Sequence, residues 1–325
     1  MNIFLTGASG FVGGAFVKAH GKAHTITAMS RSEKSDAVIR AFGATPVRSA
    51  LGEVKPEHLK GIDAVIHCAA HVEEWGPWEG YWRMNVEGTK QLLAAAKQAG
   101  VERFVHIGTE AALFHGQHMR NVDETYPLSL NSPYPYSRTK AHAEKAVREA
   151  NDAKAGFATI VLRPRMIWGE GDQTILPVVR EMVAKGAFAW IDGGRAKTST
   201  TNIANLVHAM NLALTKGQGG EAYFILDTEN PVVFRDFMTK MMQAAGIPVP
   251  TRTVPGWLIR TIAYAGETTF RALNLKSKPP LTRFTANIMS RDCILNDAKA
   301  RREMNYAPPV TTEHGLRNLA ASPNK

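Results

Sequence analysis

Short apolar runs alternate with longer helical stretches along the first half of the chain. The apolar runs predict strands over residues 2–6, 24–29, 45–48, 63–68, 103–108 and 158–162. The stretches between them predict helices over 11–20, 32–42, 80–99 and 136–150. Strands separated by helices of this length are typical of a parallel sheet that is covered on both faces. We therefore expect an α/β fold built on a doubly wound parallel sheet.

The first predicted strand runs directly into the glycine-rich turn Gly7-Ala8-Ser9-Gly10-Phe11-Val12-Gly13. Gly7 permits the tight turn, and Gly10 lets backbone N–H groups approach a pyrophosphate at the start of the next helix. Gly13 lets that helix pack closely on the strand. This order of strand, turn and helix predicts a Rossmann-type sheet that binds a dinucleotide. The residues expected to contact the cofactor here are Gly7, Ser9, Gly10, Phe11, Val12 and Gly13.

The end of the second predicted strand bears on the choice of cofactor. An NAD-binding protein usually places an acidic residue there for the ribose 2′-hydroxyl. This chain has Ser30, Arg31 and Ser32 instead, and its nearest acid, Glu33, lies past the turn. A guanidinium flanked by hydroxyls suits a 2′-phosphate. The sequence therefore favours NADP over NAD.

Tyr136 and Lys140 form a candidate proton-transfer pair on the helix predicted over 136–150. Residues four apart lie on one face of a helix, so the phenol and the ammonium are within reach of each other. A free tyrosine titrates near pH ~10, and a neighbouring ammonium lowers that pKa toward the neutral range. Tyr134 precedes the same helix, but its partner at this spacing, Arg138, is a poor proton relay.

After residue 165 the pattern changes. We expect a loop over 169–172, a helix over 174–185, a strand over 221–227 that returns to the sheet, and a helix over 234–245. These elements predict an NAD(P)-binding domain and a smaller, mostly helical, substrate-binding lobe. The first comprises 1–167 with 196–227 returning to it, and the second comprises 168–195 and 228–325.

Charge and composition narrow the possible partners. The formal charge is +10, and residues 231–325 carry 14 Lys and Arg against 6 Asp and Glu. They form no dense basic run with stacking aromatics, so we expect no nucleic-acid partner. Two cysteines far apart in sequence predict neither a disulfide framework nor a metal site. The helical pattern over 254–273 favours burial against the lobe or a second subunit over contact with a membrane.

No apolar run is long enough for a membrane span, and the first strand begins at residue 2 without a targeting pattern before it. We therefore expect a cytoplasmic protein.

Several motifs together resemble one family. The glycine turn, Tyr136-x-x-x-Lys140, Asn85 within 84–89 and Arg163-Pro164 are similar to those of the extended short-chain dehydrogenase/reductases. The segments 71–76, 135–147 and 279–284 resemble the 3β-hydroxysteroid dehydrogenase-like branch, and the likeness covers nearly the whole chain.

The resemblance implies roles for particular residues. Tyr136 is the general acid/base, and Lys140 lowers its pKa and bonds the nicotinamide ribose. Thr109, which follows the fifth strand, holds the substrate oxygen, and Asn85 supports the proton path or the Lys140 geometry. The remaining cofactor contacts expected by resemblance are Ala69, Ala70 and Pro164.

Candidate substrate contacts are expected around the Tyr136–Lys140 pair. Trp75 belongs to a tryptophan cluster that either walls an apolar pocket or packs between loop and helix. Glu110 directly follows Thr109, Arg165 suits a polar or anionic group, and Trp168 lies close by in sequence.

The resulting hypothesis is an NADP-dependent oxidoreductase that interconverts a secondary alcohol and a ketone on an apolar, hydroxysteroid-like or other hydroxy/keto small molecule. One alternative is a nucleotide-sugar epimerase or dehydratase of the same superfamily. Dehydratases have two carboxylates after the Thr, whereas here Ala111 follows Glu110, and Arg31 argues against an NAD-retaining epimerase. A minor alternative is a non-catalytic NADP-binding regulator. By resemblance we also expect a homodimer formed through the helices that bear Asn85 and Tyr136.

Overall fold

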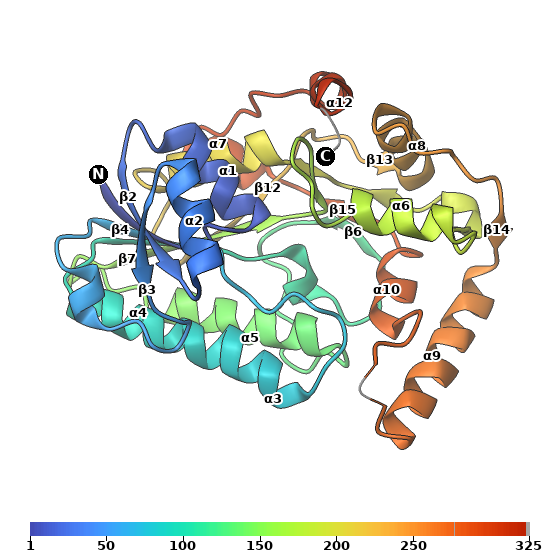
Figure 1. Cartoon of the computed structure of the whole chain (residues 1–325), viewed down its shortest axis with the longest axis horizontal. Coiled ribbons are helices and arrows are strands. Elements are labelled where there is room, and N and C mark those ends of the chain that lie inside the picture. Colours follow the sequence, from blue (N-terminus) through green and yellow to red (C-terminus); the bar gives the residue numbers. More distant parts are fainter. Residues whose placement is uncertain (276, 323–325) are drawn as a thin grey trace.

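A seven-stranded parallel sheet forms the centre of the computed structural model, which describes residues 1–275 and 277–322 (Figure 1). Its strands lie in the order β12-β7-β5-β4-β1-β2-β3. They are β1 (Asn2–Thr6), β2 (Thr25–Ser30), β3 (Thr45–Arg48), β4 (Ala64–His67), β5 (Arg103–Ile107), β7 (Ala158–Pro164) and β12 (Glu221–Ile225). The doubly wound parallel sheet is confirmed, including the late strand that returns to it beside β7. The strand order reverses beside β1, and ligands bind at such a switch point.

Helices cover both faces of this sheet. On one face lie α1 (Phe11–His20), α7 (Ile203–Ala213) and α11 (Ala298–Met304), and on the other lie α4 (Gly88–Gln98) and α5 (Pro135–Glu149) (Figure 1). α2 (Glu33–Phe42) packs beside β2 and β3. Each face is apolar because the buried strand side chains alternate between two clusters, with Ile3 and Leu5 on one side and Phe4 on the other.

The helix predicted over 80–99 is divided into three parts. α3 (Trp78–Tyr81) is followed by a π-helical turn over Trp82–Glu87 and then by α4. The turn carries Asn85, and π-turns inside α-helices often occur at functional sites. Helical spacing alone did not predict it.

A separate core contains Trp168 and Trp190 and takes its helices from α6 (Leu176–Ala184), α8 (Phe234–Ala244) and α12 (Thr312–Ala321). α10 (Arg283–Ile288) packs in a further cluster with Phe114 and Tyr134, and α9 (Gly256–Ala272) packs on α10. A four-stranded sheet joins β13 (Val232–Val233), β10 (Lys197–Thr198), β15 (Cys293–Leu295) and β6 (Met119–Val122). Two separate two-stranded sheets pair β8 (Ile167–Trp168) with β11 (Thr201–Asn202), and β9 (Trp190–Ile191) with β14 (Thr253–Val254). The division into two domains stays a prediction. Strand β6 of the four-stranded sheet lies within the segment 1–167 that the sequence assigned to the cofactor-binding domain.

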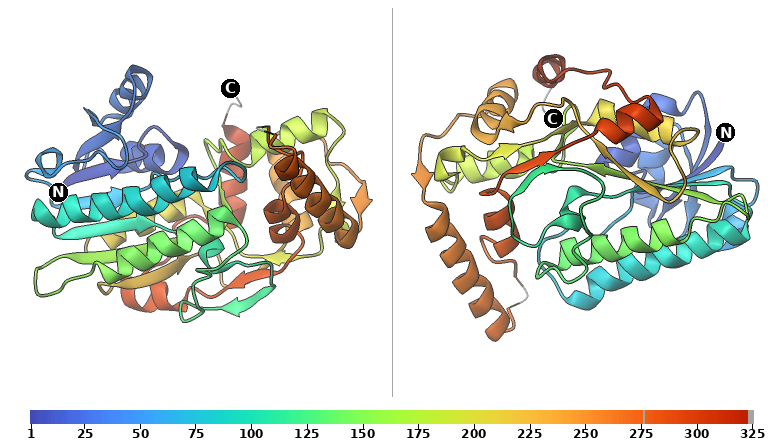
Figure 2. Two further views of the ribbon diagram at one scale, coloured as in Figure 1. Left: turned by 90° about the horizontal axis from the view of Figure 1, so that it is seen from below. Right: turned by 180° about the vertical axis from the view of Figure 1, so that it is seen from behind.

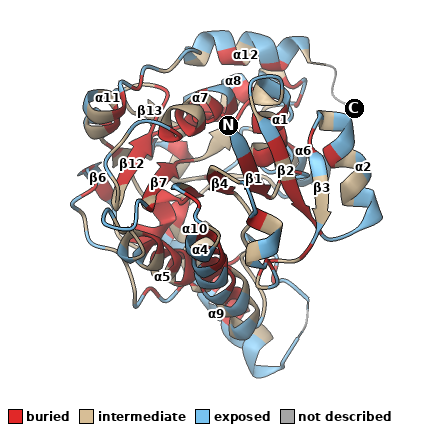
Figure 3. Ribbon diagram, turned by 90° about the vertical axis from the view of Figure 1, so that its left-hand side faces the viewer, coloured by how far each residue is buried: buried red, intermediate tan, exposed pale blue. Residues whose placement is uncertain are grey.

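The predicted burial of the helix over 254–273 against the lobe is correct for only one of its faces. α9 buries Gly256, Ala263 and Glu267, but Trp257 is 64% exposed and Ile262 is 52% exposed. The reason is that α9 extends away from the body and packs mainly on α10 (Figure 2). Its outward side is exposed over most of its length (Figure 3).

Candidate active site

The glycine turn is shaped by close contacts between backbone segments. Gly7 has φ +77°, and a Cβ placed there would lie 3.0 Å from the Ala69 backbone nitrogen. A Cβ on Gly13 would lie 2.4 Å from the Gly7 carbonyl oxygen. Gly10, at the N-terminus of α1, gives no side-chain cap to the helix. The N–H groups of this first turn therefore fit the role of a pyrophosphate-binding cradle.

The side chains at the end of β2, Ser30, Arg31 and Ser32, are only partly bonded to other groups of the protein. Ser32 caps α2 by accepting a hydrogen bond from the Ser35 N–H at 3.2 Å, and the Ser30 and Ser35 hydroxyls are 2.6 Å apart. Arg31 is exposed and forms no ion pair with any residue that the structure describes. One guanidinium is therefore available to an anion at the edge of the sheet.

Tyr136 and Thr109 meet where α5 begins beside the end of β5. The side chain of Thr109 lies beside that of Tyr136, and its hydroxyl donates to Glu110 Oε2 at 2.8 Å. Burial raises the pKa of Tyr136, the Glu110 charge raises it further, and the nearby Thr109 hydroxyl lowers it. On balance the pKa of Tyr136 is raised, whereas the resemblance implies that Lys140 lowers it. The geometry explains the difference, because the Lys140 ammonium is bonded to the sheet.

Lys140 is buried and points toward β5. Its Nζ donates to the Ile107 carbonyl at 2.8 Å and lies 3.3 Å from His106 Nε2. Burial lowers the pKa of Lys140 to about 8, and the Glu144 carboxylate opposes this shift. His106 is a contact that the sequence analysis missed, because only the register of β5 against α5 brings it to Lys140.

A second missed group is the ion pair between Glu144 and Arg163. The two side chains are 0% and 1% exposed. Glu144 follows Lys140 by four residues, so helical spacing was an available signal for placing it on the same face. Arg163 joins this face of α5 to β7, directly before Pro164, which ends that strand and is also buried.

Asn85 connects the π-helical turn to the loop that follows β4. Its side chain accepts from the His71 N–H at 2.7 Å and donates to the His71 carbonyl and to Thr139 Oγ1. It therefore holds this loop against α5, one residue before Lys140. Ala69 and Ala70 lie partly buried at the start of the loop.

Of the predicted substrate contacts, Trp75 keeps some exposed surface, whereas Glu110, Arg165 and Trp168 are buried and bonded within the protein. Trp75 is half-buried, and its ring meets Phe270 of α9 edge-on. Arg165 pairs with Glu110, so both charges already have a partner in the protein. Trp168 has no exposed surface and donates to Asp227.

Phe284 of α10 is another neighbour that the sequence analysis missed. Its ring centroid lies 5.8 Å from that of Tyr136 and 5.6 Å from that of Tyr134. This apolar ring borders the phenol of Tyr136. No local pattern signals the contact, because it depends on α10 folding back over the start of α5.

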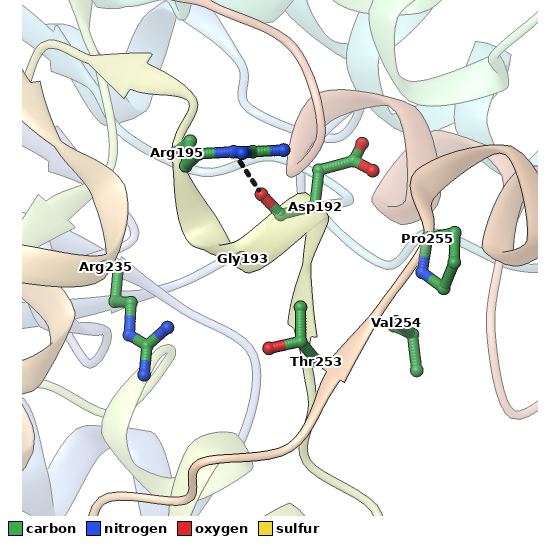
Figure 4. Close-up of a pocket in the computed structure, with 7 residues that line it drawn as sticks. All are labelled: Asp192, Gly193, Arg195, Arg235, Thr253, Val254 and Pro255. Carbon is green, nitrogen blue, oxygen red and sulfur yellow. Dashed lines mark hydrogen bonds between the residues drawn. The ribbon is translucent and has the colours of Figure 1, made fainter.

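A separate hollow lies at the N-terminus of α9 (Figure 4). Asp192, Arg195, Arg235 and Thr253 contribute to its lining, and none of the predicted site residues does. Among the described residues there is no group of three or more His, Cys, Asp or Glu side chains arranged for a metal ion. No helix within this part of the chain is long and apolar enough to cross a membrane.

The parallel sheet, the glycine turn and the Tyr–Lys pair on α5 match the fold and motifs that the resemblance to the short-chain dehydrogenase/reductases implies. A family model described as the 3-beta hydroxysteroid dehydrogenase/isomerase family matches residues 4–255. The chain belongs to this family, and it is an NAD(P)-dependent oxidoreductase.

Similar proteins agree with this assignment. A 4-hydroxy-2-methyl-3-oxo-4-farnesyl-3,4-dihydroquinoline-1-oxide ketoreductase from Stigmatella aurantiaca is 38% identical over 97% of this chain and 95% of its own. A 2-alkyl-3-oxoalkanoate reductase from Stenotrophomonas maltophilia is 33% identical over 99% of each. The solved structure of UDP-glucuronic acid 4-epimerase from Bacillus cereus, in complex with NAD, superposes with a TM-score of 0.75. It covers 99% of this chain and 98% of that one at 18% identity, which shows a shared fold.

Proposed function

We propose that this protein is an NADP-dependent ketoreductase that interconverts a ketone and a secondary alcohol on an apolar substrate, with Tyr136 as general acid/base. One observation carries the proposal: the side chains of Thr109 and Tyr136 lie next to each other near the buried Lys140, at the carboxyl ends of the parallel strands. The two similar reductases are named for an oxo group on a farnesyl-bearing or alkyl-bearing molecule, which supports a keto substrate with a hydrocarbon part.

Each side chain has a distinct task in this proposal. The hydroxyls of Thr109 and Tyr136 orient the substrate oxygen, and Tyr136 gives that oxygen its proton during reduction and takes it back during oxidation. Lys140, charged below a pH of about 8, would donate a hydrogen bond to the nicotinamide ribose of the bound cofactor. Asn85 keeps the loop after β4 in place beside α5. Phe284 supplies apolar surface next to the phenol, and Trp75 packs on Phe270 of α9.

The bound cofactor supplies or accepts the hydride. The N-terminus of α1 with Gly7, Ser9, Gly10, Phe11, Val12 and Gly13 would hold its pyrophosphate, and Ala69, Ala70 and Pro164 would border the nucleotide. Ser30, Arg31 and Ser32 would take a 2′-phosphate. The ion pair between Glu110 and Arg165 uses the one carboxylate that follows Thr109, which argues against the paired-acid chemistry of a dehydratase.

The test of the catalytic role is Tyr136→Phe, assayed with NADPH on a panel of alkyl-substituted ketones. We expect turnover to fall about 10²- to 10⁴-fold, the usual contribution of a positioned acid. NADPH affinity should change little, because the phenyl ring of Tyr136 is retained. If Tyr136→Phe reduced ketones as fast as the parent enzyme, the proposed role of Tyr136 would be wrong.

The cofactor preference is tested by Arg31→Ala. Loss of a charge-assisted contact to the 2′-phosphate should weaken NADPH binding by about 1.5–3 kcal/mol, or roughly 10- to 100-fold, and leave NADH binding nearly unchanged. Arg40→Ala, which removes another exposed cation farther along α2, is the matched control. Equal losses for both cofactors would contradict a 2′-phosphate site at Arg31. Both affinities can be measured by titration calorimetry.

A further inference from the structure

α9 and the residues that directly follow it carry more than half of the exposed large apolar side chains in the described part of the chain. Ten large apolar side chains are exposed in the described part of the chain, and six of them lie within residues 257–275. Their exposed fractions are 64% for Trp257, 37% for Leu258, 52% for Ile262, 60% for Tyr264, 64% for Leu273 and 41% for Leu275. Scattered exposed apolar residues are ordinary, but a concentration of this kind marks an interaction surface.

The arrangement follows from how α9 packs. Gly256, Ala263 and Glu267 recur at helical spacing and form the buried side. The opposite side carries Leu258 and Ile262, one turn apart. Figures 1 and 2 show α9 projecting from the body beside α10, with its outer side facing away from the sheet.

Charge decides which kind of partner fits this surface. Residues 251–291 contain seven Lys and Arg but only one acid, Glu267, and Glu267 is buried in an ion pair with Arg283. Nearby acids reduce this excess: Glu74 on the loop after β4 pairs with Lys278, Glu73 precedes it, and Asp192 accepts a hydrogen bond from the Gly256 N–H at the start of α9. The region remains basic after these three acids are counted.

A basic region around a helix with exposed aromatic and aliphatic side chains matches the boundary between anionic lipid headgroups and acyl chains. A second copy of this chain is a poorer match, because it would bring another basic surface to one that is already basic.

The same helical pair also borders the active site. Phe270 of α9 contacts Trp75, and Phe284 of α10 contacts Tyr136. Thr285 of α10 and Thr282, which caps its N-terminus, both donate hydrogen bonds to Glu74. A bilayer held against α9 would therefore lie one helical layer from the reactive phenol.

We propose that the exposed side of α9, with Trp257, Leu258, Ile262, Tyr264 and Leu273, docks on the surface of an anionic lipid bilayer. The docking is peripheral, and it does not depend on which ketone the enzyme reduces.

The test uses the full chain and sedimentation with large unilamellar vesicles. One set is phosphatidylcholine alone, and the other is an equal mixture of phosphatidylcholine and phosphatidylglycerol. We expect binding to the mixed vesicles, weaker binding to phosphatidylcholine, and a loss of the difference as salt screens the charges. Equal binding to both sets, or binding to neither, would overturn the proposal.

A matched pair of variants locates the surface. Leu258→Glu with Ile262→Glu places two charges one turn apart on α9 and should weaken binding to the mixed vesicles at least about tenfold. Val178→Glu with Met182→Glu makes the same change on α6, where the exposed fractions are 53% and 37%, and should leave binding unchanged. Equal losses in both pairs would mean that α9 is not the docking element.

Two further measurements distinguish a bilayer from a second copy of the chain as the partner of α9. Trp257→Phe retains the apolar surface and should bind vesicles while losing part of the vesicle-induced shift in tryptophan emission, which gives a readout that needs no destabilising charge. Light scattering on the parent chain reports its mass without lipid. A dimer that the α9 charge pair dissociates and the α6 pair does not would show that a second copy covers this side, and the bilayer proposal would be wrong.

Discussion

At the scale of single residues, the environment of Lys140 makes a testable link between structure and pH dependence. An ammonium can only donate hydrogen bonds, so His106 must accept at Nε2, and burial and nearby positive charge lower the pKa of His106 and keep it neutral. In His106→Leu the buried ammonium loses this acceptor, and the pKa of Lys140 should fall by about one unit from its value of about 8. The alkaline limb of kcat/KM for ketone reduction should move down by the same amount.

His106→Gln is the matched control for this residue, because the Gln side-chain oxygen can take the place of Nε2. His106→Gln should return the alkaline limb of the kcat/KM profile to its position in the parent enzyme. A purely structural role for His106 would instead lower activity in both variants without moving the pH profile.

These residues also show what the sequence could and could not reveal. Tyr136 and Lys140 were predictable from their spacing on one helix, but His106 and Phe284 reach the site only through tertiary register.

At the scale of secondary-structure elements, the buried pair Glu144–Arg163 joins α5 to β7. Glu144→Gln leaves the Arg163 charge buried without its counter-ion, which should destabilise the protein by about 3–5 kcal/mol. Replacing both residues together, with Glu144→Leu and Arg163→Met, should cost much less, because a buried pair is largely offset by the energy of removing its charges from water. Urea denaturation of the three proteins measures the difference.

The exposed i,i+4 pair Lys145–Glu149 on the same helix is the control, and Glu149→Gln should change stability little. A double variant as unstable as Glu144→Gln would contradict this account. The predicted strand and helix positions agree with the structure because apolar periodicity determines them locally, as with α1 at 11–20. The π-helical turn at Asn85 and the exposed side of α9 were not predicted, since they depend on what each element packs against.

At the scale of the whole molecule, the sequence predicted from the short run at 221–227 that a late strand returns to the sheet, and β12 does so beside β7. It did not predict that β6, from the first half of the chain, pairs with β15 near the end. That pairing joins segments distant in sequence, and neither strand has a pattern that names its partner. The loops between β5 and α5 are thereby tied to the α9–α10 region that borders Tyr136.

Stability of the whole chain should fall in mild acid because of its buried histidines. Burial lowers the pKa of His67 to about 3, and His67 is bonded through its ring nitrogens to Thr6 and Thr89. Between pH 6.5 and pH 3 the unfolded chain therefore binds a proton at this residue that the folded chain does not, so stability is lost as the pH falls through that window. His106 acts in the same direction. In His67→Gln the slope of unfolding free energy against pH, measured by urea denaturation from about pH 5 to about pH 6.5, should decrease by about 1 kcal/mol per pH unit. Parallel profiles for variant and parent would show that His67 does not contribute to acid sensitivity.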